Sequence, residues 1–152
     1  MNCIFCQIAE GISPSHIIWE DEKHLSFLSI YPNTPGFTVV IPKSHHSSYA
    51  FEQTDLVVSE LVLAAKNTAL LIDRALPNVA RTGMILEGYG VDHLHAKLFP
   101  MHGTGEDSKF RKISSCVDTY FDKYEGYISS HDSARADDSA LSELAAHIKS
   151  FN

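Results

Sequence analysis

An α+β fold, in which a five-stranded antiparallel sheet carries one long helix, is the fold class that the sequence predicts. Three apolar runs of strand length precede a single long helical pattern, and two more follow it. No helical crossover separates most of these runs, so neighbouring strands are expected to be antiparallel. The 152 residues, 44% of them hydrophobic and 20% charged, suit one compact domain with a real core.

The N-terminal part of the chain is expected to form a short helix and then three strands. The composition of "CIFCQIAEG" is typical of a short helix closed by Gly11. The stretch "HIIWEDEKHLSFLSI" contains two apolar-rich runs joined at Asp21-Glu22-Lys23, which predicts a hairpin. The turn residues of "YPNTPG" then precede "FTVVIP", a β-branched run that Pro42 stops.

A long amphipathic helix and two further strands are expected next. Thr54 or Asp55 caps the helix, which ends near Pro77. Strands in "TGMILEG" and "HLHAKLF" flank the loop "EGYGVD", whose glycines permit close approach of a ligand to the backbone. The apolar helix positions recur at three and four residues and are expected to cover the sheet: Val57, Leu61, Ala64, Ala65, Thr68, Ile72 and Ala75.

The C-terminal third of the chain is more polar, and it is expected to be an extension, 104–152, that packs on the domain formed by 1–103. "GTGEDSKFRKISS" resembles a loop with a basic cluster, and "YFDKYEGYISSHD" is either a strand or an irregular arm. The end, "ADDSALSELAAHIKSF", has acidic residues in its first turn and places Leu141, Leu144, Ala145 and Ile148 on one face. A terminal amphipathic helix is therefore expected.

Charge and hydropathy restrict the partners and the compartment. The net charge of −7 repels a polyanion and no long Lys/Arg stripe interrupts it, so we expect no nucleic-acid partner, although a small anion held by local groups is compatible. No run of about 18 apolar residues occurs, and "MNCIFCQIAEG" lacks the features of a secretory signal. We therefore expect a cytoplasmic protein that does not associate with membranes.

Two histidines and a lysine alternate with apolar residues in "GVDHLHAKLFPMHG". Period two predicts a strand that places His93, His95 and Lys97 on one face, with neighbours roughly 7 Å apart. A phosphate-sized anion can touch two such groups at once. The alternative is a solvated strand face with incidental histidines.

The cysteines favour metal or redox chemistry over disulfides. Three cysteines are too few for a disulfide framework, and Cys3 and Cys6 have the C-x-x-C spacing of a metal site or a redox motif. Redox chemistry of the thioredoxin kind expects a strand before the motif, whereas this one begins at residue 3. Cys116 is most simply a buried or incidental thiol.

Together, "CIFCQIAEG", "WEDEKHLSFLSIYPNTPGFTVVIPKSH" and "HLHAKLFP" resemble the histidine triad (HIT) nucleotide hydrolases and transferases over roughly residues 3 to 103. The resemblance implies that His95 is the nucleophile of a phosphohydrolase or nucleotidyl transferase. It would attack the α-phosphorus of a small nucleotide or nucleotidyl conjugate, and water would resolve the nucleotidyl-histidine. The resemblance also implies a two-fold homodimer.

The same resemblance implies an apolar nucleobase slot and a zinc site. Zinc would be structural, held by Cys3, Cys6, His45 and His93, which supply two thiolates and two imidazoles for a closed tetrahedral site. The residues at the slot positions are equally explicable as core: Ile4, Phe5, Ile8, Phe27 and Ile30.

Several positions depart from the family pattern. Lys97 stands where the third triad histidine belongs, and Phe37 stands where another histidine is common. Tyr89 and Gly90 replace the usual phosphate-contacting Gln and Ser, Leu86 lies near a common Asn, and Ser29 replaces a ribose-binding Asp. The phosphate and ribose sites would then be built from the backbone of Gly88, Tyr89 and Gly90, from Lys97, or from His102. The alternative function is a non-catalytic, zinc-stabilised nucleotide- or anion-binding module of the same fold.

Overall fold

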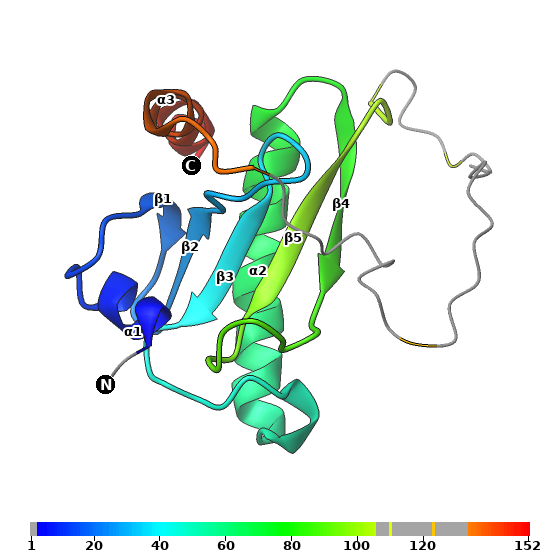
Figure 1. The fold of residues 1–152 in the computed structure, drawn as a ribbon. Helices are drawn as coiled ribbons and strands as arrows, with labels where there is room; N and C mark the ends of the chain where they lie inside the picture. The colour runs from blue at the N-terminus through cyan, green and yellow to red at the C-terminus, as the bar shows by residue number, and fades with distance from the viewer. Residues whose placement is uncertain (1–2, 106–109, 111–122, 124–133) are drawn as a thin grey trace.

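One antiparallel sheet, with strand order β1-β2-β3-β5-β4, organises the described part of the chain (Figure 1). The computed structural model describes residues 3–105, 110, 123 and 134–152. Within them the structure confirms the predicted α+β fold, with a long helix on the sheet and a C-terminal helix. The strands are β1 (His16–Glu20), β2 (His24–Leu28), β3 (Thr38–Pro42), β4 (Val79–Ile85) and β5 (Ala96–His102).

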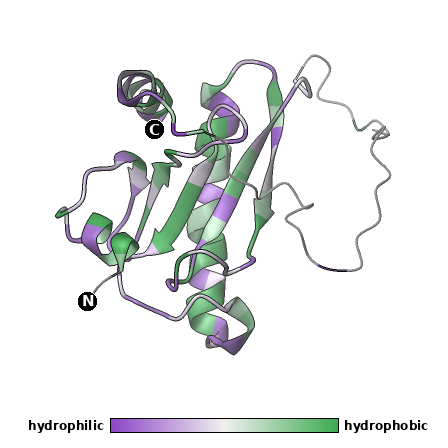
Figure 2. Cartoon of the chain, in the orientation of Figure 1, coloured by the Kyte–Doolittle hydropathy of each residue, from purple (hydrophilic) through white to green (hydrophobic). Residues whose placement is uncertain are grey.

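Both faces of the central strands β2 and β3 are buried, because a different helix covers each face. Leu28 and Val40 point into the core beneath α2 (Asp55–Ala75). Their neighbours Phe27 and Val39 belong to a second apolar cluster together with Ile8 of α1 (Ile4–Ala9). Figure 2 shows the hydrophobic residues that dominate β3. Period-two alternation therefore separates a structural face, under α2, from a face under α1.

The helix α2 begins where its capping residue predicts. The backbone N–H of Val57 donates to Thr54 Oγ1 at 3.4 Å, which confirms Thr54 rather than Asp55 as the N-cap. The buried face contains Leu61, Ala64, Ala65, Thr68, Leu71, Ile72 and Ala75. Although α2 has 21 residues, none of the helices in the described ranges is long and apolar enough to cross a bilayer.

The C-terminal helix α3 (Asp138–Lys149) packs beside β1 and α2 (Figure 1). Its Leu141, Ala145 and Ile148 share one core with residues of the sheet and α2, as its apolar spacing predicts. His147 Nε2–H donates to the carbonyl of Ala75 at 2.6 Å. The division of the chain at residue 103 stays a prediction. The expected basic loop and the expected strand or arm fall mostly outside the described residues, as does Cys116.

The prediction that His93 and His95 lie within a strand is wrong, because β5 begins at Ala96. The backbone N–H of Leu94 donates to the carbonyl of His46 at 2.8 Å, in the loop after β3, and so does not join the sheet ladder. The His93 N–H donates to Val91 in a tight bend. The two histidines therefore sit in an irregular segment that leads into the sheet.

Candidate active site and metal centre

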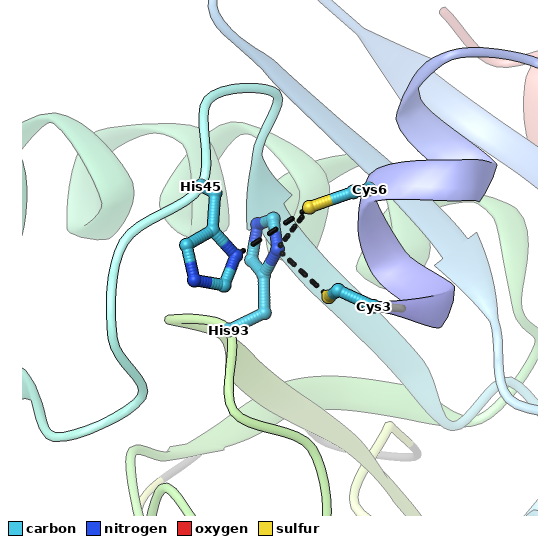
Figure 3. Close-up of side chains that lie close together, drawn as sticks. All are labelled: Cys3, Cys6, His45 and His93. Carbon is cyan, nitrogen blue, oxygen red and sulfur yellow. Dashed lines mark hydrogen bonds between the residues drawn. The ribbon is translucent and has the colours of Figure 1, made fainter. Parts of the chain in front are cut away.

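Four predicted zinc ligands from three separate segments converge at one end of the sheet (Figure 3). Cys3 and Cys6 lie one helical turn apart at the start of α1, His45 lies in the loop after β3, and His93 lies just before β5. The candidate ligand atoms are all within 4.8 Å of one another. Three of the four residues are buried, and His45 is exposed.

The separations within this cluster fit a tetrahedral zinc ion. Cys3 Sγ and Cys6 Sγ each lie 3.5 Å from His93 Nδ1, and Cys6 Sγ lies 3.4 Å from His45 Nδ1. A tetrahedral zinc with ordinary Zn–S and Zn–N bonds separates sulfur from nitrogen by roughly 3.5 Å. The predicted Cys2His2 set is thus confirmed as a cluster with the geometry that zinc requires.

The protonation of the cluster also fits a metal site. His93 Nε2–H donates to the carbonyl of Pro42 at 2.9 Å, which leaves the Nδ1 lone pair directed toward the sulfurs. Burial lowers the pKa of His93, so the imidazole is neutral near pH 7. Burial, followed by the contact with Cys3, raises the pKa of the Cys6 thiol in the metal-free chain. Metal binding at Cys6 therefore has to displace a proton.

A cavity of about 380 Å³ lies next to the cluster, on the α1 side of the sheet. Its wall is mostly apolar, with residues from α1, from β2 and the turn after it, and from the segment before β5. The exposed Tyr31 and Tyr89 also belong to this wall. The predicted site residues that line it are Ile4, Phe5, Ile8, Phe27, Ser29, Ile30, Tyr89, Gly90, His95 and Lys97.

His95 is oriented in this wall by its own backbone. Its Nδ1–H donates to the carbonyl of His93 at 2.7 Å, so the lone pair belongs to Nε2. The side chain is only 3% exposed and meets Phe5 edge-on, with ring centroids 5.4 Å apart. Burial, followed by the positive charge of Lys97, lowers the pKa of His95. A neutral imidazole with a fixed tautomer is a competent nucleophile near pH 7.

Lys97 lines the same cavity and forms an ion pair with Glu87. The sequence interpretation missed Glu87. Strand register would have indicated it, because Ile85 of β4 pairs with Lys97 of β5, and a residue two positions beyond Ile85 lies on the same face. The side chains of Lys97 and Glu87 are 13% and 9% exposed, so the pair is largely removed from water.

Two predicted residues lie outside the cavity wall. Gly88 has φ +75°, and a Cβ there would lie 2.8 Å from the carbonyl oxygen of Ser48. The absence of a side chain at Gly88 therefore allows the two backbone segments to lie close together. His102 ends β5 and donates from Nε2–H to the carbonyl of Pro35 at 2.8 Å. Phe37 and Val39 also line the wall and were not predicted to do so. The alternation of β3 would have indicated Val39, because it places this residue on the same face as Phe27.

The fold and the paired sites define a class of α+β protein with a metal cluster beside an apolar, histidine-bearing cavity. Residues 10–104 match the HIT domain family model. An uncharacterized HIT-like protein from Methanocaldococcus jannaschii is 31% identical over 117 residues, which are 74% of this chain and 90% of the relative. The chain therefore belongs to the HIT domain family.

Two further likenesses bear on function and fold. Adenosine 5'-monophosphoramidase from Schizosaccharomyces pombe is 31% identical over 100 residues, which are 66% of this chain and 74% of that protein. The crystal structure of a zinc-bound histidine triad family protein from Mycobacterium smegmatis superimposes with a TM-score of 0.70 and covers 99% of this chain and 93% of its own. At 21% identity the second likeness concerns the fold alone.

Proposed function

We propose that the chain is a nucleotide phosphohydrolase or nucleotidyl transferase that acts at an α-phosphate through His95. The observation that carries this proposal is the fixed tautomer of His95, which directs a neutral Nε2 from a cavity wall shared with Lys97. The apolar residues of α1 and β2 in the same wall suit a nucleobase. The phosphoramidase activity named for the fission yeast relative supports a nucleotidyl substrate.

The proposed reaction has two displacements. His95 Nε2 attacks the α-phosphorus, a phosphorus–nitrogen bond forms, and the bond from phosphorus to the leaving group breaks with its electron pair on that group, which takes up a proton from solvent. Water then attacks the same phosphorus, gives a proton back to solvent, and releases His95 and a nucleoside monophosphate. Lys97, at the position that the resemblance gives to a third triad histidine, donates hydrogen bonds to phosphate oxygens during both steps.

We propose a structural role for zinc at Cys3, Cys6, His45 and His93. The ion supplies coordination bonds that fix α1, and no reaction step needs it. A helix of six residues whose N-cap residue, Cys3, makes no side-chain cap bond has little stability of its own. Because Ile4, Phe5 and Ile8 of α1 line the cavity, the metal cluster also sets the position of the cavity wall.

A single-turnover assay with adenosine 5'-phosphoramidate tests the proposed function. Acid-quenched samples are analysed by intact mass, beside calorimetric titrations of AMP. We expect a transient adduct with the mass of one nucleotidyl group, and release of AMP. The binding-module alternative expects AMP binding with no adduct and no release of the leaving group, and that result would reject an enzyme acting on this substrate class.

Substitution of Lys97 should show how much its positive charge contributes to binding and turnover. Lys97→Met removes the cation from the cavity wall, and we expect kcat/KM to fall about 10²-fold with weaker AMP binding. Lys97→Arg keeps the positive charge and the hydrogen-bond donors, so AMP binding should persist. Steady-state kinetics and calorimetry measure both variants. Parent-like kinetics in Lys97→Met would remove this residue from the mechanism.

We also propose that the chain is a homodimer. Leu56, Leu63 and Leu70 lie seven residues apart on the outer face of α2 and are 65%, 58% and 48% exposed. This spacing forms one apolar stripe that a second copy can cover. Light scattering should give twice the chain mass of 16.9 kDa. Leu63→Glu should halve that mass, whereas Phe51→Glu, outside the stripe, should not; a parent protein of monomer mass would contradict the proposal.

A further inference from the structure

We propose that Glu87, the ion-pair partner of Lys97, shifts the selectivity of the phosphate site toward singly charged phosphorus groups and away from doubly charged phosphate monoesters. This inference rests on the proposed nucleotide site. It names the substrate class more narrowly: phosphodiesters, phosphoramidates and other esters that carry one negative charge at the reacting phosphorus. Glu87 would act on the ligand by its charge alone, because it lies beside Lys97 and is not itself part of the cavity wall.

The two members of the ion pair lie at different distances from the cavity. Lys97 lines the cavity, and the Glu87 carboxylate contacts its Nζ from a position outside the wall. Both side chains are nearly removed from water, where an unpaired charge is unfavourable. Within the described part of the chain, Lys97 is the one Lys or Arg of the cavity wall. The local cation is therefore already balanced before any phosphate arrives.

The backbone next to Glu87 is also held in place. Gly88 follows Glu87 with φ +75°, and its backbone is pressed against the backbone of Ser48. The loop therefore cannot easily carry Glu87 away when a phosphate approaches Lys97. A bound phosphate shares the ammonium with Glu87 and remains within a few ångströms of a second negative charge.

The effect of that second charge depends on the charge of the ligand. Coulomb repulsion between Glu87 and a dianion is twice that with a monoanion at the same distance. The factor by which Glu87 weakens binding of the dianion is therefore the square of the factor for the monoanion. With solvent screening we take the penalty as about threefold for a monoanion and about tenfold for a dianion. Glu87 thereby offsets part of the advantage that a second negative charge gives the phosphate monoester product, whose second pKa is about 6, at Lys97. Glu87 is therefore expected to favour dissociation of the product.

The test compares two ligands of different charge. AMP, a dianion at pH 7.5, and its methyl ester, a monoanion, are titrated calorimetrically into the parent, Glu87→Gln and Glu87→Asp, and the recovered ester is checked for cleavage. We expect Glu87→Gln to bind AMP about tenfold more tightly and the ester about threefold more tightly. Glu87→Asp, which restores the charge, should return the selectivity to that of the parent. A merely structural role would weaken both ligands together.

Glu60→Gln is the matched control, because it removes one carboxylate from another Lys–Glu pair, Lys23–Glu60, which lies outside the cavity wall. It should change neither affinity. If Glu87→Gln does not fold, Glu87→Met, a second neutral side chain of similar length, answers the same question: AMP should gain at least threefold more affinity than the ester.

Each outcome has a distinct meaning. Equal changes for the two ligands in the neutral Glu87 variants, with AMP still bound by the parent, would overturn the charge-selectivity role alone. Absence of AMP binding in every variant and in the parent would overturn the proposed nucleotide site, and this inference with it.

Discussion

Replacing His95 with alanine is expected to abolish the nucleotidyl adduct and to lower turnover at least about 10³-fold. The nucleophile contributes to the chemical step, so AMP should still bind within a few fold of the parent affinity. Two features make this expectation specific to His95. Its Nδ1–H is committed to the carbonyl of His93, and its pKa is lowered chiefly by burial, so Nε2 carries an available lone pair near pH 7.

A histidine at the other end of β5 provides the control. His102 lies at the far end of β5, outside the cavity wall, where it bonds to Pro35. His102→Ala should therefore keep the adduct and most of the turnover. Intact mass after acid quenching and single-turnover rates measure both variants. Full activity in His95→Ala would refute the mechanism, and loss of activity in both variants would indicate that general destabilisation causes the effect.

The sequence was sufficient for those features that depend on local spacing. Thr54 caps α2 because a hydroxyl before an amphipathic run satisfies a free N–H, and the cap is local. The hairpin of β1 and β2 follows from two apolar runs around a short polar turn. The alternation of Leu28 and Phe27 on β2 likewise assigns each side chain to a face without knowledge of the fold.

Features that depend on contacts between distant segments were not predictable from local patterns. The strand β5 begins at Ala96, later than predicted, because the Leu94 N–H donates to the carbonyl of His46. This residue lies 48 positions earlier and belongs to another loop. The partner of Lys97 was missed because Glu87 becomes its neighbour only through the register of β4 and β5. His102 was assigned to the phosphate site by its residue type, whereas the length of β5 carries it away. The metal ligands were found in advance because the resemblance supplied their positions.

The metal cluster should control both the stability of the chain and the affinity of the cavity. We expect Cys6→Ser to lose zinc and to lower the free energy of unfolding by about 3 kcal/mol, or about 6–12 °C in Tm for a chain of this size. The physical reason lies in α1, a single short helix that has few residues in its own hydrogen-bonded ladder. Without the metal, Cys3 and Cys6 no longer hold it to His45 and His93.

The same substitution should weaken AMP binding, because the freed helix carries Ile4, Phe5 and Ile8 away from the cavity. Elemental analysis, thermal melts with and without a chelator, and calorimetry with AMP follow the three effects together. Cys116→Ser, which removes the cysteine outside the C-x-x-C motif, is the control and should retain zinc, Tm and affinity. Chelation should lower the Tm of the parent toward that of Cys6→Ser and leave the variant unchanged. A parent protein that contains no zinc and melts as Cys6→Ser does would show that the cluster, despite its tetrahedral spacing, neither binds zinc nor stabilises the chain through Cys6.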